Sequence, residues 1–142
     1  MRTRQRRTKK SLVAIVDDDE SMRETTKDLL DSAGFRTVTF SSAEAFLSSP
    51  HCASAATVVT DIRMPGMSGL ELHLRLVASG HVCSTILITA YPEESVRKRA
   101  LEAGVSCYLP KPFAADELLA CLGKAIGASE KATRRRNSQK KP

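Results

Sequence analysis

Short apolar runs rich in β-branched residues alternate with amphipathic stretches along most of the chain. The runs predict five strands, at residues 12–16, 36–40, 56–60, 85–89 and 105–109. The stretches between them show helical periodicity, and capping residues or glycines mark several of their ends. They predict five helices, at residues 20–32, 42–47, 70–80, 93–103 and 114–126.

Five strand–helix units in succession predict an α/β fold built on a doubly wound parallel sheet. The run at 12–16 is continuously apolar, as expected for a strand that is covered on both faces. Right-handed crossovers place helices on both sides of such a sheet. We find neither an internal repeat nor a second domain, so the prediction is a single domain at residues 11–127.

The composition is that of an ordinary globular protein, with 142 residues, 42% of them hydrophobic and 27% charged. No run approaches the roughly 20 apolar residues that span a membrane. The sequence before the first strand does not have the pattern of a signal peptide. The four cysteines are scattered without a Cys-x-x-Cys pair, which favours reduced thiols over a disulfide or zinc framework. These features predict a cytoplasmic protein.

The basic character of the chain belongs to its two ends. Residues 1–10 contain six Lys/Arg and no acid, and residues 129–142 contain six Lys/Arg and one acid. The remaining 10 basic and 15 acidic residues give residues 11–128 a net charge near −5. We predict disordered tails at 1–10 and 128–142, because both are too polar to pack. Two interpretations stay open: the tails only raise solubility, or they attract nucleic acid or an acidic partner weakly.

Polar residues follow four of the predicted strands at the point where each run ends. Asp17 and Asp18 follow the first strand, Asp61 follows the third, Thr89 ends the fourth, and Lys111 comes just after the fifth. Because the carboxyl ends of parallel strands lie along one edge of a sheet, these side chains should meet in the crevice there. Clustered carboxylates repel one another unless a cation neutralises them, and hard oxygen ligands suit Mg²⁺ better than zinc. The sequence therefore predicts an acidic Mg²⁺ site that handles a phosphoryl group.

Each of these residues also has a purely structural interpretation. The acidic run 17–20 can simply cap the helix that begins at residue 20. Asp61 can be a metal ligand, a nucleophile or a cap, although the turn that follows it disfavours a cap. Thr89 can be an ordinary strand residue, and Lys111 a solvated lysine. Their occurrence at successive strand ends favours the functional interpretation.

Four segments together resemble the receiver domain of bacterial response regulators. These segments are 16–19 (VDDD), 61–69 (DIRMPGMSG), 88–90 (ITA) and 111–113 (KPF), with Tyr108 three residues before the lysine. Their order and spacing are specific as a set, and the resemblance covers roughly residues 11–127. Segments 89–92 and 109–113 resemble the nitrogen-fixation-type subfamily in particular. The resemblance implies a flavodoxin-like (βα)5 fold with strand order 2-1-3-4-5.

The resemblance also implies which residues bind the metal and accept the phosphoryl group. Asp61 would take a phosphoryl group from the phosphohistidine of a sensor histidine kinase. Asp18, Asp61 and the backbone carbonyl of Arg63 would bind Mg²⁺ directly, and Asp17 would act through water.

The resemblance further implies how the phosphoryl group is held and sensed. Thr89 and Lys111 would bind its oxygens. Tyr108 would change rotamer together with Thr89, and the Lys111–Pro112 peptide bond would be cis. Phosphorylation would then favour the conformation in which these partners are available.

The predicted function is that of a phosphoacceptor in a two-component phosphorelay, able at most to release its own phosphoryl group, rather than a turnover enzyme. A hydrolase that uses Asp61 as nucleophile is an alternative, disfavoured because Arg63 stands where a second acid would be needed. A nucleic-acid-associated protein with a vestigial pocket is another alternative.

Residues 128–142 are too short and too charged for a DNA-reading domain, so we interpret the chain as a stand-alone receiver rather than a fragment. Phosphorylation is expected to change a protein-contact face built from the helix at 93–103, the strand at 105–109 and the last helix. That face would bind an unknown downstream protein or a second copy of the chain. We expect neither membrane association nor sequence-specific nucleic-acid binding.

Overall fold

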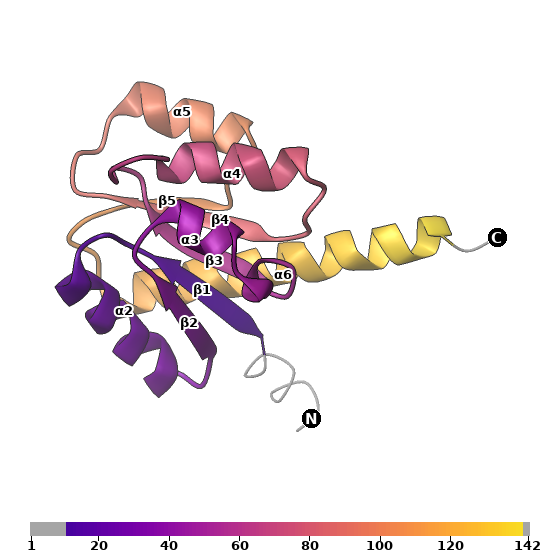
Figure 1. Cartoon of the computed structure of the whole chain (residues 1–142), viewed down its shortest axis with the longest axis horizontal. Helices are drawn as coiled ribbons and strands as arrows, with labels where there is room; N and C mark the ends of the chain where they lie inside the picture. The colour runs from indigo at the N-terminus through magenta and orange to yellow at the C-terminus, as the bar shows by residue number, and fades with distance from the viewer. Residues whose placement is uncertain (1–10, 141–142) are drawn as a thin grey trace.

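The computed structural model describes residues 11–140, and it contains a five-stranded parallel sheet with the order β2-β1-β3-β4-β5 (Figure 1). The strands are β1 (Leu12–Val16), β2 (Arg36–Phe40), β3 (Thr57–Asp61), β4 (Ser84–Thr89) and β5 (Cys107–Pro110). Both the α/β class and the strand order are therefore confirmed. All first residues of the strands lie along one edge of the sheet, here called the amino edge, and all last residues lie along the opposite, carboxyl edge.

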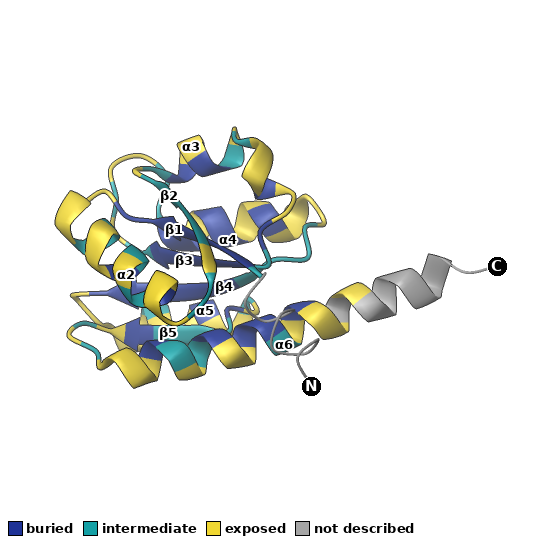
Figure 2. Cartoon of the chain, turned by 90° about the horizontal axis from the view of Figure 1, so that it is seen from below, coloured by how far each residue is buried: buried dark blue, intermediate teal, exposed yellow. Residues whose placement is uncertain are grey.

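Helices cover both faces of the sheet, as the continuous apolar runs predicted. The helices are α2 (Glu20–Ser32), α3 (Ala43–Leu47), α4 (Gly69–Ala78), α5 (Glu94–Glu102) and α6 (Ala115–Lys140), with a 3₁₀ turn, η1 (Pro50–Cys52). Side chains of α2 and α6 pack with Val13 and Ile15 on one face, and those of α3 and α4 pack with Ala14 and Val16 on the other. Figure 2 shows buried positions concentrated in the strands and on the inner sides of the helices. Among the described residues, no helix is long and apolar enough to cross a membrane.

Helix α6 is longer than predicted. It continues to Lys140, whereas the sequence predicted an end at Ile126. The domain boundary at residue 127 stays a prediction. The predicted tail at residues 1–10 and the last two residues lie outside the described residues. Between residues 128 and 140 there is no Gly or Pro, and Ala, Lys, Arg, Glu and Gln are good helix formers.

A buried serine attaches this part of α6 to the sheet. The Ser129 hydroxyl donates a hydrogen bond to the Ala56 carbonyl at 2.7 Å and accepts one from the Ser84 amide at 3.2 Å. The Ser84 hydroxyl in turn donates to the carbonyl of Ala125 at 2.7 Å. These bonds satisfy backbone groups just before β3 and at the start of β4. The partners lie far away in sequence, which is why periodicity gave no sign of them.

A buried histidine ties α4 to its neighbours. His73 is 3% exposed, and its Nε2 donates to the carbonyl of Ala103 at 2.8 Å, at the end of α5. Its Nδ1 shares a hydrogen bond with the Thr85 hydroxyl, also at 2.8 Å, in β4. His73 therefore has a partner on each ring nitrogen and fixes α4 against both β4 and the end of α5. No role was predicted for His73 from the sequence.

Candidate functional site

Three carboxylates meet at the carboxyl edge of the sheet, as predicted. Asp17 and Asp18 follow β1, and Asp61 is the last residue of β3, which pairs with β1 in parallel register. Oxygen atoms from the three side chains all lie within 4.8 Å of one another. Asp17 is buried, Asp61 is half-buried and Asp18 is exposed, so the cluster opens to solvent on the side of Asp18.

Lys111 supplies positive charge to this cluster. Its Nζ lies 3.3 Å from Oδ2 of Asp61 and 3.9 Å from Oδ2 of Asp17. The exposed fractions of the three side chains are 17%, 14% and 10%, so solvent screens these ion pairs much less than surface pairs. The Lys111 amide donates to the Thr89 carbonyl at 2.8 Å, and the Lys111–Pro112 peptide is cis, as the resemblance implied. One lysine cannot balance three carboxylates, and the site keeps a net negative charge.

The pKa of Asp17 reflects the excess of negative charge in this cluster. Burial raises the pKa of its carboxyl, and the charges of Asp61 and Asp18 act in the same direction. The Asp19 amide, which donates to Oδ1 of Asp17 at 2.9 Å, and the Lys111 charge offset only part of this effect. The ionised cluster is therefore short of positive charge, which is the condition that a divalent cation relieves.

The neighbouring Asp19 caps α2, which is the structural role that the sequence allowed for the acidic run 17–20. Its Oδ1 accepts a hydrogen bond from the Met22 amide at 3.2 Å and so caps α2. Asp17 and Asp18 do not cap the helix; they belong to the carboxylate cluster. The run 17–20 thus contains both a helix cap and two candidate metal ligands.

The loop after Asp61 returns so closely that one position must be glycine. A Cβ on Gly69 would lie 2.3 Å from the backbone oxygen of Asp61. Ser68 and Glu71 form a capping box at this point, with bonds of 3.1 and 2.8 Å between side chains and amides. The Ser-x-x-Glu spacing was readable from the sequence and marks the start of α4 more sharply than periodicity did. The bend holds the Asp61 peptide firmly in place.

A carboxylate from α3 supports the same loop. Oε2 of Glu44 accepts a hydrogen bond from the Met67 amide at 3.0 Å. Hydrogen bonds from its own backbone amide and from Met67 lower the pKa of this carboxyl. Gly66 adopts a φ of +78°, and a Cβ there would lie 2.8 Å from the Glu44 carboxylate. Glu44 was not among the predicted residues, because nothing in its local sequence indicates a contact with this loop.

Thr89 and Tyr108 end or lie in the strands beside the cluster, but their hydroxyls bond to loop backbone rather than to its carboxylates. Thr89 is 2% exposed, and its hydroxyl accepts a hydrogen bond from the Tyr91 amide at 3.0 Å. The Tyr108 hydroxyl accepts from the Glu93 amide at 3.1 Å and donates to the Glu93 carbonyl at 3.5 Å. Its ring packs with Ile62 against the apolar cluster that includes Leu87. The Tyr108 hydroxyl thus has its partners in the backbone of the residue that precedes α5.

Arg63 makes a contact that the sequence did not predict. Its guanidinium carbon lies 4.9 Å from the centre of the Tyr91 ring, within the range of a cation–π interaction. The contact joins the loop after β3 to the loop after β4. Arg63 lies two residues after Asp61, and Tyr91 lies two residues after Thr89. Tyr91 is 64% exposed, so this contact forms at the surface. The predicted role of the Arg63 carbonyl as a metal ligand stays a prediction.

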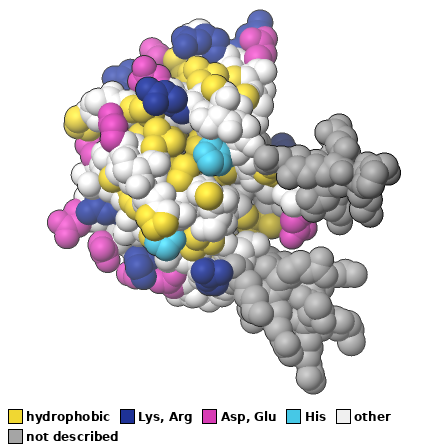
Figure 3. All heavy atoms as spheres, turned by 45° about the vertical axis from the view of Figure 1, so that its right-hand side comes forward, with side chains coloured by type: hydrophobic (Ala, Val, Ile, Leu, Met, Phe, Trp, Pro, Cys, Tyr) yellow, Lys and Arg dark blue, Asp and Glu magenta, His cyan; other side chains and the backbone are white. Residues whose placement is uncertain are grey.

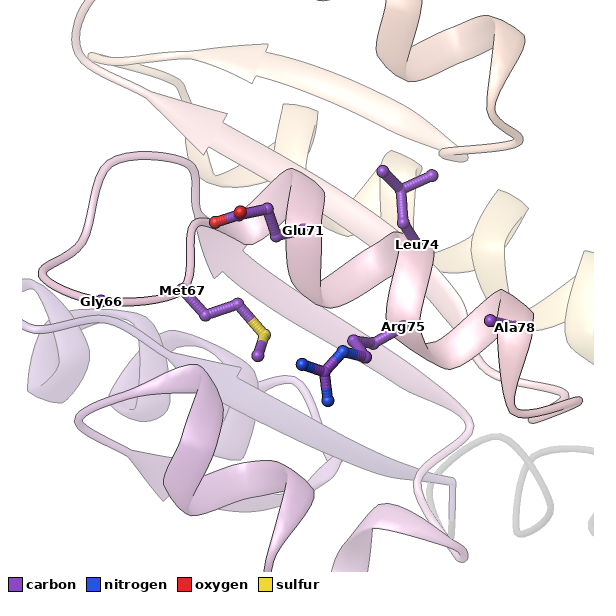
Figure 4. A pocket seen from close by; sticks show the side chains of 6 residues that line it. All are labelled: Gly66, Met67, Glu71, Leu74, Arg75 and Ala78. Atoms are coloured by element: carbon purple, nitrogen blue, oxygen red, sulfur yellow. The ribbon is translucent and has the colours of Figure 1, made fainter.

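A hollow of about 490 Å³ lies elsewhere, along α4, and contains none of the candidate residues. Its lining residues are Gly66, Met67, Glu71, Leu74, Arg75 and Ala78. Figure 4 shows Met67 and Arg75 pointing toward each other beside the helix. This lining is a mixture of apolar and charged groups, and the candidate site is the carboxylate cluster at the carboxyl edge.

Comparison with known proteins agrees with this site. Residues 13–123 match the response regulator receiver domain family. The transcriptional regulatory protein FixJ of Bradyrhizobium diazoefficiens is 36% identical over 127 residues, which cover 89% of this chain and 62% of FixJ. The structure of the response regulator StyR gives a TM-score of 0.84 at 38% identity, covering 92% of this chain and 66% of StyR. The crystal structure of FixJ-N gives a TM-score of 0.75 at 33% identity, covering 82% of this chain and 94% of FixJ-N.

This chain belongs to the response regulator receiver family. It is a receiver domain of the two-component type, a class that accepts phosphoryl groups from sensor histidine kinases and is not a classical turnover enzyme. The chain spans less than two thirds of the length of FixJ, so the whole-protein activity of such relatives does not carry over to it directly.

The raised pKa of Asp17 leads to a prediction about stability. Because the pKa is higher in the folded than in the unfolded state, the ionised carboxylate lowers the free energy of unfolding at neutral pH. Asp17→Asn should therefore raise this free energy in urea titrations at pH 7 without Mg²⁺. The gain should shrink as the pH falls through the raised pKa toward the ordinary value of 3.8. Asp19→Asn, a change in the exposed cap, should give no such gain; equal stability of wild type and Asp17→Asn at pH 7 would contradict the prediction.

Proposed function

We propose that Asp61 is the phosphoacceptor of this receiver domain. The observation that carries the proposal is the ion pair of 3.3 Å between Lys111 and Asp61 inside a cluster of three carboxylates. Asp61 is the member of the cluster that ends a strand and precedes a loop anchored by Gly69 and Glu44. The loop thus constrains its backbone, and Lys111 donates to one oxygen of its half-buried carboxylate.

In the proposed step, a carboxylate oxygen of Asp61 forms a bond to the phosphorus of a kinase phosphohistidine. The phosphorus–nitrogen bond breaks, and its electron pair returns to the imidazole of the kinase. Lys111, already next to Asp61, would offset the charge on the phosphoryl oxygens. The hydroxyl of Thr89, the last residue of the neighbouring strand β4, would become a further partner. For that, Thr89 must give up its bond with the Tyr91 amide or share it.

Asp18 and Asp61, the Arg63 carbonyl, and Asp17 through water form the proposed Mg²⁺ site. Carboxylate oxygens within 4.8 Å of one another, with too little positive charge nearby, fit a hard divalent cation. When bound, Mg²⁺ would neutralise charge on the phosphoryl group and the acidic cluster. No nitrogen or sulfur ligand belongs to this cluster, which disfavours zinc.

Signalling is proposed to pass through Tyr108 to the face formed by α5, β5 and α6. A cavity of about 360 Å³ adjoins Tyr108 and is lined by Pro92, Glu93, Glu94, Arg97, Tyr108 and Pro110. The Tyr108 hydroxyl holds the start of α5 through the Glu93 backbone, so a change in its rotamer would release that contact and reshape the cavity. The partner of this face is proposed to be a downstream protein or a second copy of the chain. Release of the phosphoryl group by the domain itself is the only turnover proposed.

Phosphorylation of Asp61 can be tested directly. Incubated with acetyl phosphate and Mg²⁺, the chain should gain one phosphoryl group, because Asp61 has a free carboxylate oxygen for the attack. Intact-mass spectrometry measures the gain. Asp61→Asn should gain none, whereas Asp19→Asn, which alters only the cap of α2, should be modified like the wild type. A phosphorylated Asp61→Asn would place the nucleophile elsewhere.

Mg²⁺ should stabilise the folded domain by mass action. At a hundredfold excess over the dissociation constant the gain should be about 2.7 kcal/mol, because the ion binds only the assembled cluster. Asp18→Asn should lose most of this gain, since it removes an exposed ligand without disturbing the core. Thermal unfolding with and without Mg²⁺ measures the effect, with Asp19→Asn as the matched control. A wild-type melting temperature that does not change in millimolar Mg²⁺ would rule out the proposed Mg²⁺ site.

If Tyr108 is the switch, its substitution should affect partner binding but not the phosphorylation of Asp61. Tyr108→Ala should still be phosphorylated on Asp61, because its ring contacts α5 and not the carboxylates. It should nevertheless lose phosphorylation-dependent self-association or partner binding. Light scattering of the phosphorylated chain measures self-association, and affinity capture with partners measures the rest. Leu74→Ala, an exposed change on α4 outside this face, should behave as wild type. Unchanged association of phosphorylated Tyr108→Ala would refute the switch role.

A further inference from the structure

Glu44 is an exposed acidic residue that is bonded to the loop of the candidate site. On the face of the molecule seen in Figure 3, basic and acidic side chains are interspersed, so an exposed glutamate is not unusual in itself. Glu44 differs because its Oε2 accepts a hydrogen bond from the Met67 amide at 3.0 Å, across 23 residues of sequence. Met67 belongs to the loop between Asp61 and α4. The bond therefore joins α3 to the loop that follows the proposed phosphoacceptor.

The Glu44 carboxylate is attached to a part of the fold that is itself firmly held. Ala43 and Phe46, on the same short helix, are fully buried in the apolar core. Hydrogen bonds from the amides of Glu44 itself and of Met67, together with the charge of Arg75, lower the pKa of this carboxyl. The carboxylate is therefore ionised at neutral pH, and it holds the loop from a fixed point on α3.

The loop is held at two points, and Arg63 lies between them. At one point the Gly69 amide donates a hydrogen bond to the Ile62 carbonyl at 3.0 Å. At the other, Gly66 has a φ of +78°, and a Cβ there would lie 2.8 Å from Oε2 of Glu44, so this carboxylate fits closely against the loop. The position of the Arg63 carbonyl, proposed above as a Mg²⁺ ligand, therefore depends on both attachments.

We propose that Glu44 is a positioning residue of the phosphoacceptor site, and that its bond to Met67 sets the affinity of the site for Mg²⁺. This inference rests on the proposed Mg²⁺ site, although Glu44 is not part of the carboxylate cluster. Groups that orient metal ligands from outside the ligand set typically change metal affinity by roughly 10–100-fold when they are mutated. Because Glu44 acts on Arg63 through several residues of a loop, the lower end of this range is expected.

A loss of negative charge alone would also weaken the binding of a cation, so two substitutions at the same position are needed. Glu44→Gln removes the charge but keeps an oxygen that can accept the hydrogen bond from Met67. Glu44→Ala removes both the charge and the acceptor. A positioning role predicts a larger loss of Mg²⁺ affinity in Glu44→Ala than in Glu44→Gln, whereas an effect of charge alone predicts equal losses.

The experiment titrates the full chain with Mg²⁺ by isothermal titration calorimetry. Glu44→Ala should bind Mg²⁺ about tenfold more weakly than the wild type, and Glu44→Gln should lie between the two. Glu102→Ala removes an exposed carboxylate at the end of α5 and should bind like the wild type. Gly66→Ala, which crowds the Glu44 carboxylate from the side of the loop, should also weaken binding.

A second measurement follows the loop without any metal. Hydrogen exchange of the Met67 amide, read by NMR in the absence of Mg²⁺, should be faster in Glu44→Ala than in the wild type or Glu44→Gln, because only Glu44→Ala lacks the acceptor. Equal Mg²⁺ affinities of the wild type and Glu44→Ala, equal losses in Glu44→Gln and Glu44→Ala, or unchanged exchange at Met67 would each overturn the positioning role alone. Absence of Mg²⁺ binding by the wild type would overturn the proposed Mg²⁺ site and the positioning role with it.

Discussion

Repulsion among three carboxylates is the constraint on which the function of this domain depends. The parallel sheet forces Asp17, Asp18 and Asp61 together because each lies at a strand end on the same edge. Folding accepts this cost because Lys111 approaches from the end of β5 and because Asp18 remains in water. The repulsion destabilises the isolated domain, but it also makes the cluster attract a cation. The cation and Lys111 together can then neutralise the charge of a phosphoryl group.

The surroundings of the cluster show how a fold makes such a site rigid on one side and adaptable on the other. The loop after Asp61 is fixed by the close return of Gly69 and by the Glu44 carboxylate. The Thr89 hydroxyl is instead held by one hydrogen bond from the Tyr91 amide, and the Tyr108 hydroxyl only by bonds with the backbone of Glu93. Bonds of this kind contribute about 1 kcal/mol each, so they can break without unfolding the core.

The sequence was a good guide wherever local pattern and global fold agree. The run before Asp17 became a buried central strand because all five of its residues are apolar, and the strand ends placed Asp61 and Lys111 correctly. It was a poor guide wherever a residue finds its partner across the fold. Ser129 extends α6 through bonds to Ala56 and Ser84, and these contacts leave no trace in local periodicity. For the same reason, neither the two hydrogen bonds of the His73 ring nor the contact of Arg63 with Tyr91 could be predicted.

The close approach of Gly69 to Asp61 has a consequence for how this protein tolerates mutation. Even a methyl group at position 69 would meet the Asp61 carbonyl at 2.3 Å, so the backbone that aims the carboxylate would have to move. Gly69 has no side chain that could carry a charge or react. In a survey of inherited variants, however, its loss would resemble the loss of Asp61 itself, and a search limited to reactive side chains would overlook one of the positions that the site can least afford to change.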